Sequence, residues 1–141
     1  MGKVKDLTTV TTGSSADFVI KDKSDGTATE KITIANLFAI INTTATSITA
    51  YAGGGQANAT QLSAKYYKVS TVATSGDSVK LPSATAGTEV FVVNGGGATL
   101  DVYPQTGEYV NGVVNDVKQL GLNYIGSAHY VCIANGYWST F

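Results

Sequence analysis

The sequence predicts an all-β fold, in which a short N-terminal segment precedes a C-terminal β-sandwich or prism-like domain. From residue 62 onward, short runs rich in Val, Ile, Tyr and Thr recur about every ten residues, with Gly, Pro or Asn between them. This spacing is typical of a sandwich, barrel or prism. In addition, only 13% of the 141 residues are charged, about half of the usual share. Copies of such a chain repel one another weakly, so the composition favours self-association.

The N-terminal segment, up to residue 42, contains a predicted hairpin. Residues 17–20 form an apolar run, and residues 29–34 alternate between polar and apolar as a strand does. Between them lies Asp25-Gly26, which tolerates the positive φ angles of a tight connection. Residues 35–41 are apolar, and so short a run is compatible with a helical turn or with a strand.

Residues 43–61 are rich in Gly, Thr and Ala and include three consecutive glycines. This composition predicts an extended linker between the two parts of the chain. Ile48 and Tyr51 are apolar anchors that a free coil does not need, so we expect the linker to be packed. Both side chains are candidates for contacts between subunits.

Residues 62–141 form the predicted β-domain. Strands are expected where β-branched and aromatic residues gather, at residues 65–73, 78–81, 88–93, 98–103, 107–112, 113–122, 128–133 and 137–141. Pro82 and Pro104 each end a run, because proline cannot donate to a sheet ladder. Asn135-Gly136 stands between the last two runs and predicts a hairpin.

Residues suited to catalysis or metal binding are scarce. A hydrolase needs a nucleophile, a base and a group that orients the base, whereas the only histidine, His129, lies in an apolar run. The single cysteine, Cys132, lies in the same region and is expected to be a buried, inert side chain. Metal sites need several His, Cys or carboxylate ligands at defined spacings, and the chain lacks such spacings. We therefore expect no enzyme activity, no cofactor and no metal.

Charge and hydropathy argue against two classes of partner. The net charge is −1 and the lysines form no stripe, whereas a nucleic-acid partner requires a basic surface. The apolar runs are far shorter than the roughly 20 residues of a membrane-spanning helix. No apolar region follows Lys3 and Lys5, so a secretory signal is not expected.

The eight tyrosines and the tryptophan allow two interpretations. In the first, they fill a core or a subunit interface, and the candidates for the interface are the terminal cluster of Tyr137, Trp138 and Phe141. In the second, exposed rings stack on sugars, and the candidates are Tyr66, Tyr67, Tyr109 and Trp138.

The N-terminal segment contains four short motifs in a fixed order. They are Val4-Lys5-Asp6-Leu7, Ala16-Asp17-Phe18-Val19-Ile20, Asp25-Gly26 and Lys31-Ile32-Thr33-Ile34-Ala35-Asn36-Leu37. With these motifs, the segment resembles the N-terminal segment of many bacteriophage fibre proteins. In those proteins the segment joins the fibre to the particle. The resemblance therefore implies that residues 1–42 attach the protein to the virion, with the candidate contacts Asp6, Leu7, Asp17, Phe18, Ile20, Ile32, Ile34 and Leu37.

The C-terminal domain is similar to a β-domain of phage head-fibre and tail-associated proteins. The matching motifs are Val79-Lys80-Leu81-Pro82, Gly87-Thr88-Glu89-Val90-Phe91-Val92-Val93-Asn94 and Leu100-Asp101-Val102-Tyr103-Pro104 with Gly107-Glu108-Tyr109-Val110-Asn111-Gly112. Such proteins are typically homotrimers, so the resemblance implies a homotrimer that binds the major capsid protein or another virion protein.

The resemblance also implies a place for the protein. Residues 43–61 leave no room for long shaft repeats, which favours a head fibre or capsid decoration protein over a long tail fibre. Such a protein is made in the host cytoplasm, is not secreted and ends in the virion. The alternative function is a tail-associated, lectin-like tip that binds a host-surface glycan.

Overall fold

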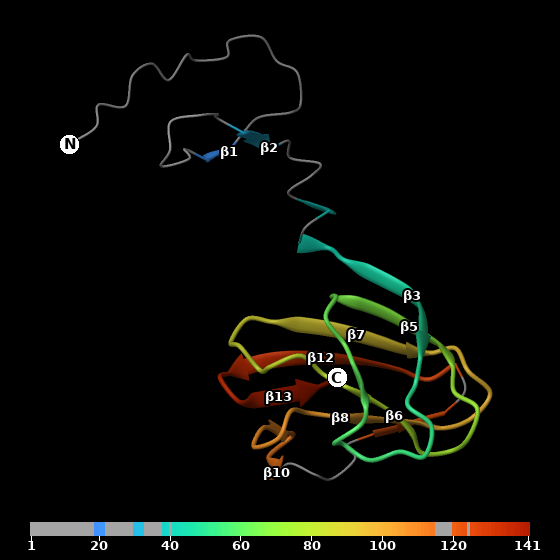
Figure 1. Cartoon of the computed structure of the whole chain (residues 1–141). Coiled ribbons are helices and arrows are strands. Elements are labelled where there is room, and N and C mark those ends of the chain that lie inside the picture. Colours follow the sequence, from blue (N-terminus) through green and yellow to red (C-terminus); the bar gives the residue numbers. More distant parts are fainter. Residues whose placement is uncertain (1–18, 22–29, 33–37, 40, 115–119, 124) are drawn as a thin grey trace, which may run out of the picture. The chain divides into compact units, whose positions relative to one another are not determined.

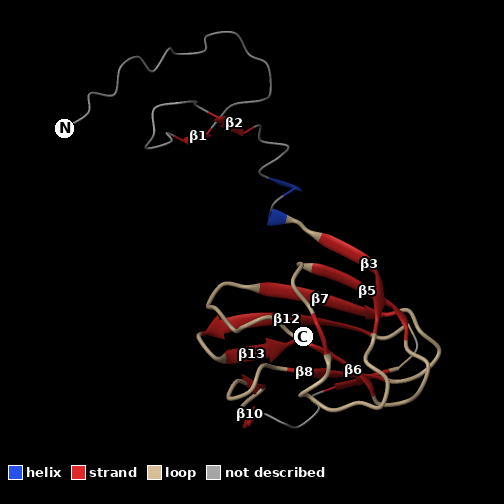
Figure 2. Ribbon diagram, in the orientation of Figure 1, coloured by secondary structure: helices blue, strands red, loops and turns tan. Residues whose placement is uncertain are grey.

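The computed structural model describes residues 19–21, 30–32, 38–39, 41–114, 120–123 and 125–141. Most of the regular structure in these residues is strand (Figure 2), which confirms the all-β prediction. The chain divides into two compact units, Met1–Ile41 and Asn42–Phe141.

Two strands pair in the first unit. β1 (Val19–Lys21) and β2 (Glu30–Ile32) are antiparallel, with Val19 opposite Ile32. The strands of the predicted hairpin are thus confirmed, while its Asp25-Gly26 turn lies outside the described residues. Phe38, Ala39 and Ile41 have helical geometry. Of the two alternatives for residues 35–41, a helical turn or a strand, the described residues therefore agree with the helical turn.

The second unit contains two β-sheets. The seven-stranded sheet has the order β10-β9-β13-β12-β7-β5-β3. Its strands are β3 (Thr44–Thr49), β5 (Tyr66–Thr71), β7 (Glu89–Asn94), β9 (Tyr109–Val110), β10 (Val113–Val114), β12 (Ser127–Ala134) and β13 (Tyr137–Thr140). The four-stranded sheet has the order β11-β8-β6-β4. Its strands are β4 (Thr60–Gln61), β6 (Asp77–Lys80), β8 (Leu100–Tyr103) and β11 (Leu120–Leu122).

From β3 to β8 the chain alternates between the two sheets (Figure 1). β3, β5 and β7 pair in parallel in the larger sheet, and β4, β6 and β8 pair in parallel in the smaller one. The chain therefore winds through three successive coils, each with one strand in each sheet. A coil of this kind buries its apolar faces against its neighbours, as a solenoid repeat does.

Antiparallel strands follow the third coil. β12 pairs with β7 and with β13, and β11 pairs with β8, all in antiparallel orientation. β12 and β13 form the hairpin predicted from Asn135-Gly136. Gly136 has a φ angle of 81°, which is unfavourable for a residue with a side chain. Both sheets are thus continued beyond the coils by strands that return in the opposite direction.

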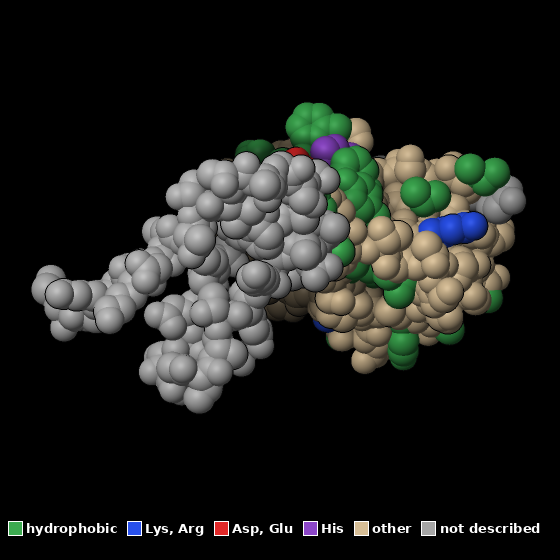
Figure 3. Space-filling model, turned by 90° about the horizontal axis from the view of Figure 1, so that it is seen from above, with side chains coloured by type: hydrophobic (Ala, Val, Ile, Leu, Met, Phe, Trp, Pro, Cys, Tyr) green, Lys and Arg blue, Asp and Glu red, His purple; other side chains and the backbone are tan. Residues whose placement is uncertain are grey.

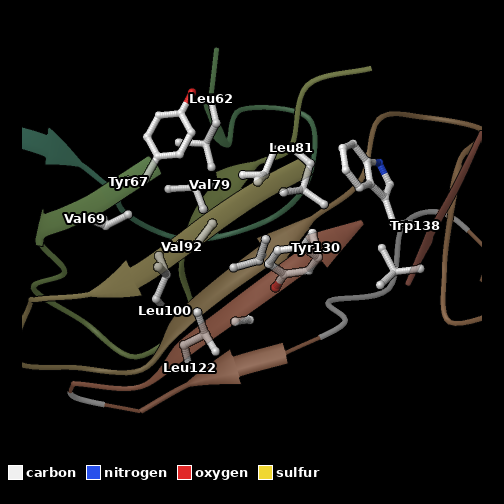
Figure 4. Close-up of a cluster of buried hydrophobic side chains, with 14 of the residues drawn as sticks. Leu62, Tyr67, Val69, Val79, Leu81, Val92, Leu100, Leu122, Tyr130 and Trp138 are labelled. Carbon is white, nitrogen blue, oxygen red and sulfur yellow. The ribbon is translucent and has the colours of Figure 1, made fainter. Parts of the chain in front are cut away.

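The core lies between the two sheets (Figure 4). Side chains alternate between the two faces of a strand, so every second residue enters this layer. Trp138 and Tyr130 are the largest fully buried side chains. Around them lie further apolar residues from the strands of both sheets and from positions directly after them, among them Leu62, Tyr67, Val69, Val79, Leu81, Val92, Leu100 and Leu122. Burial of each Val or Leu side chain stabilises the fold by about 1.5–3 kcal/mol.

Residues 43–61 are extended and packed, as expected from Ile48 and Tyr51, but they lie within the second compact unit and do not link two parts of the chain. β3 is the first strand of the larger sheet, and Ala50 and Ala59 are buried. Tyr51 and Ser78 exchange backbone hydrogen bonds of 2.9 and 3.0 Å. The buried Gln56 donates from Nε2 to the carbonyl oxygen of Pro104 at 2.9 Å. Small residues, which produced the linker-like composition, allow the segment to pack closely against β6.

Candidate interaction surface

A row of aromatic rings crosses the outer face of the seven-stranded sheet. Tyr66 on β5 lies opposite Phe91 on β7, and Phe91 lies opposite His129 on β12. Phe141, directly after β13, exchanges backbone hydrogen bonds of 3.1 and 3.5 Å with His129. We call these four side chains the aromatic row.

Strand alternation explains why the row faces outward. Tyr67, Val92 and Tyr130 are the sequence neighbours of Tyr66, Phe91 and His129, and all three are buried in the core. The neighbouring rings must therefore point to the opposite face. β7, β12 and β13 pair in antiparallel orientation. When the outer face of antiparallel strands meets water, its side chains are usually polar, so a row of rings there is unusual.

Two of the three neighbouring ring pairs in the row are stacked, and the third is tilted. The ring centroids of Tyr66 and Phe91 are 5.1 Å apart with an interplanar angle of 19°. Those of Phe91 and His129 are 3.8 Å apart at 11°, and those of His129 and Phe141 are 6.3 Å apart at 48°. Phe91 thus has a stacked ring on each side. What it can offer to a partner is its edge, which carries the positive end of the ring quadrupole.

Charged side chains flank the row. On one side, Lys65 Nζ lies 3.0 Å from Glu89 Oε2 and 5.6 Å from the ring centroid of Tyr66. The hydrogen bond between the two side chains raises the pKa of Lys65 and lowers the pKa of Glu89. On the other side, Lys68 lies opposite Val93 and is exposed. The row therefore has an ion pair along one flank and a lysine along the other.

Further apolar side chains extend the surface. Val93 is 37% exposed, Ile133 67%, Tyr137 45% and Phe141 82%. Tyr137 also stacks on Tyr109, with centroids 4.7 Å apart and an angle of 8°. Figure 3 shows hydrophobic side chains gathered around the histidine. We call the aromatic row together with Val93, Val131, Ile133 and Tyr137 the outer apolar face. Extended apolar surfaces of this kind mark interaction sites.

His129 behaves here as an aromatic ring. Its Nε2 atom is buried and has no hydrogen-bond partner among the described residues, and its ring lies against Phe91 and Phe141. Neither Phe91 nor His129 is among the candidate site residues predicted from the sequence. A signal was present, because residues 90–93 are apolar at both the inward and the outward positions of the strand.

The structure separates the residues proposed for a subunit interface. Tyr137 and Phe141 lie on the outer apolar face. Trp138 is 1% exposed and its Nε1 donates to Glu108 Oε2 at 3.4 Å, so its assignment to an interface is wrong. Ile48 is half-buried against the core of its own chain, and Tyr51 is exposed but pairs with Ser78 on the smaller sheet.

The residues proposed for sugar stacking are likewise divided. Tyr67 and Trp138 are buried, and burial raises the pKa of the Tyr67 hydroxyl. Neither ring can reach a ligand from inside the core. Tyr66 and Tyr109 are half-buried and each stacks on another ring. The ring that stacks on Tyr109, that of Tyr137, is 45% exposed.

The residues proposed for virion attachment fall mainly outside the described part of the chain. This applies to Asp6, Leu7, Asp17, Phe18, Ile34 and Leu37. The other two, Ile20 and Ile32, lie in β1 and β2, where Ile20 is paired with Lys31.

The described residues contain no group of three or more His, Cys, Asp or Glu side chains that could hold a metal ion. They also contain no helix long and apolar enough to span a membrane. Comparison of the chain with protein-family models, with curated proteins and with solved structures finds no match.

Proposed function

We propose that this protein is a structural component of a bacteriophage particle, a head fibre or capsid decoration protein that acts as a homotrimer. Residues 1–42 bind the major capsid protein or another shell protein, and the β-domain projects from the surface. The protein acts by adhesion rather than catalysis. It is made in the host cytoplasm and carried in the virion.

The observation that carries this proposal is the outer apolar face. A sheet face that carries the rings of Phe91, His129 and Phe141 side by side suits the flat contact between proteins, where aromatic residues are enriched. Charged residues make up only 13% of the chain. So low a share suits a protein that stays within an assembly. The resemblance of the sequence motifs to those of phage fibre proteins indicates that this assembly is a phage particle.

The division of the chain supports the separate role of the N-terminal segment. Met1–Ile41 and Asn42–Phe141 are distinct compact units, and the β1–β2 hairpin belongs to the first. A segment with its own local structure can bind a shell without disturbing the domain behind it. Three such segments on one trimer would reinforce one another, because each bound segment raises the effective concentration of the others.

A binding assay with empty capsids tests the attachment role. The whole chain and a chain that lacks residues 1–41 are incubated with empty capsids of the phage that encodes the protein, and capsid-bound protein is measured after sedimentation. We expect loss of binding on truncation. Leu7→Asp and Ile20→Asp in the whole chain should weaken binding, whereas Tyr51→Asp, outside the segment, should not. Full binding by the truncated chain would refute the attachment role of residues 1–42.

A second candidate function is recognition of a host-surface glycan by a lectin-like tip. It is favoured by the stacked pair of Tyr109 and Tyr137, because Tyr137 is 45% exposed and an exposed ring can stack on a sugar. A glycan array with the wild-type protein and the Tyr137→Ala variant tests it. Reproducible sugar binding that the variant loses would favour this function over adhesion to the shell alone.

A further inference from the structure

The aromatic row runs in a particular direction. Its rings come from one residue on each of β5, β7 and β12 and from Phe141 beside β12. It therefore crosses the strands and follows the direction in which the coils stack. Along this line, each strand contributes one ring to the outer face.

We propose that three copies of the chain associate with their aromatic rows around a common threefold axis that runs parallel to the stacking direction of the coils. This inference rests on the proposed homotrimer and names its interface. In a closed threefold assembly, equivalent residues lie at the same height around the axis. Each ring then meets the same ring of two other copies, so that apolar edges meet apolar edges at every level of the row.

Stacking within the row favours this partner over a sugar. A sugar packs on a ring face, but Phe91 has Tyr66 on one side and His129 on the other. Tyr66 stacks on Phe91, and Lys65 Nζ lies 5.6 Å from the Tyr66 ring centroid. The exposed edges, in contrast, are apolar surface that can pack by van der Waals contact against the edges of the same rings in the other copies.

The flanking charges are complementary across a threefold interface. Such an interface is heterologous, so the right flank of one copy faces the left flank of the next. One flank bears Lys68, for which the described residues provide no ion-pair partner, and the other bears the ion pair of Lys65 and Glu89, in which the Glu89 side chain is 40% exposed. Lys68 of each copy thus faces this pair on its neighbour, where the exposed carboxylate of Glu89 can accept a second cation and orient the copies.

The native mass of the whole chain is the first test, measured by light scattering during size-exclusion chromatography. We expect three times the 14.5 kDa chain mass. Phe91→Glu and Phe141→Glu place three carboxylates close to the axis and should convert the trimer to monomer. Phe141 is 82% exposed, so its substitution leaves the domain folded, which circular dichroism verifies. The matched control is Tyr51→Glu, at a residue 41% exposed on the other sheet, and this variant should remain trimeric.

Cross-linking tests the geometry in a Cys132→Ser background. Lys68→Cys protein mixed with Glu89→Cys protein should give covalent pairs with a short bismaleimide, and the doubly substituted chain should give covalent trimers. Within one chain the two positions are about 13 Å apart along the strands, too far for a short linker. Neither single variant alone should cross-link.

The outcomes separate this interface from the proposed function. A monomeric or dimeric wild-type mass, or single variants that cross-link to themselves, would overturn the threefold arrangement. A trimer that survives both Phe91→Glu and Phe141→Glu would overturn the aromatic interface but leave the homotrimer intact. The capsid-binding assay is independent of each of these results, because it reports on residues 1–42.

Discussion

At the scale of single residues, a buried amide secures a turn of the coil. Asn94 at the end of β7 is fully buried. Its Nδ2 donates to the carbonyl oxygens of Ala98 and Leu122, both at 2.7 Å, and its Oδ1 accepts from the Gly96 N–H at 2.9 Å. Buried polar groups in folded proteins are almost always paired. One side chain thus joins the turn after β7 to the end of β11 in the other sheet.

Asn94→Ala removes the partner of three backbone groups. We expect the free energy of unfolding to fall by about 3 kcal/mol, because each buried group left without a partner costs about 1–3 kcal/mol. Urea denaturation followed by the fluorescence of Trp138 measures the loss. The matched control is Asn135→Ala, since Asn135 is exposed and accepts one bond of 2.9 Å from the Ala86 N–H. A similar loss in both variants would contradict this account of Asn94.

Asp77 holds the turn between β5 and β6 in a similar way, but through an ionised carboxylate. The N–H groups of Thr74 and Ala73 donate to Asp77 Oδ2 at 3.0 and 2.9 Å, and the Gly53 N–H donates to Oδ1 at 3.3 Å. These bonds, with that from Thr74 the largest contribution, lower the pKa of Asp77 below its ordinary value of 3.8. The carboxylate therefore ties the glycine-rich segment before β4 to the turn before β6.

The lowered pKa of Asp77 predicts a dependence of stability on pH. The ionised carboxylate stabilises the fold above the unfolded-state pKa, and this contribution is lost as the pH falls through the folded-state pKa. Asp77→Asn should therefore lower the urea midpoint at pH 7, and its difference from wild type should narrow below about pH 4. Urea midpoints at about pH 7 and about pH 3 test this. A difference that is the same at both would show that the charge of Asp77 is not responsible.

At the scale of the elements, the spacing of the coils depends on close contact between successive turns. Gly96 lies in the turn after β7, and a Cβ atom built there would be 2.4 Å from the Val72 nitrogen. Val72 follows β5, the strand of the previous coil. At the adjacent Gly97, in contrast, a Cβ atom would have nothing within 4 Å. Two neighbouring glycines thus have different roles.

Gly96→Ala should push two coils apart, whereas Gly97→Ala should not. We expect the first substitution to lower the free energy of unfolding by about 2–3 kcal/mol, as overpacking does. The second should be neutral or slightly stabilising, because alanine restricts the unfolded chain more than glycine does. Urea or thermal unfolding of the two variants measures the difference. Equal effects would contradict the close approach of the coils at Gly96.

At the scale of the whole molecule, the second unit contains a core of its own. Trp138, Tyr130 and the aliphatic residues between the sheets all come from Asn42–Phe141. The first coil supplies β3 and β4, on which β5 and β6 pack in parallel. Removal of this coil would expose the apolar side of the next one.

Two fragments test where the domain begins. Residues 42–141 expressed alone should unfold cooperatively, with the same blue-shifted Trp138 fluorescence as the whole chain. Residues 62–141, a fragment that begins at the domain boundary predicted from composition, should fail to fold, because they lack β3 and β4. Equal cooperativity of the two fragments would show that residues 43–61 are dispensable, as a linker is.

Local signals predicted local structure. The pairing of β1 with β2 and the β12–β13 hairpin were both foreseen from turn residues next to alternating runs. Most strands of residues 62–141 lie where β-branched and aromatic residues gather. The parallel pairs were not foreseen, since β5 and β7 meet across an intervening strand in the other sheet. Two parallel strands are joined by a long crossover connection. No turn residue between them therefore shows which strand pairs with which.

The sequence by itself determined the all-β class, the hairpins, the scarcity of charge and the inert setting of Cys132, whose thiol pKa is raised mainly by burial. These properties depend on composition and on neighbours along the chain. Only the tertiary structure decided that residues 43–61 are part of the domain, that Trp138 is core, and that Tyr66, Phe91, His129 and Phe141 form one row. Each of these depends on which distant strands pair and in which register, and a shift of one residue would exchange the inner and outer faces.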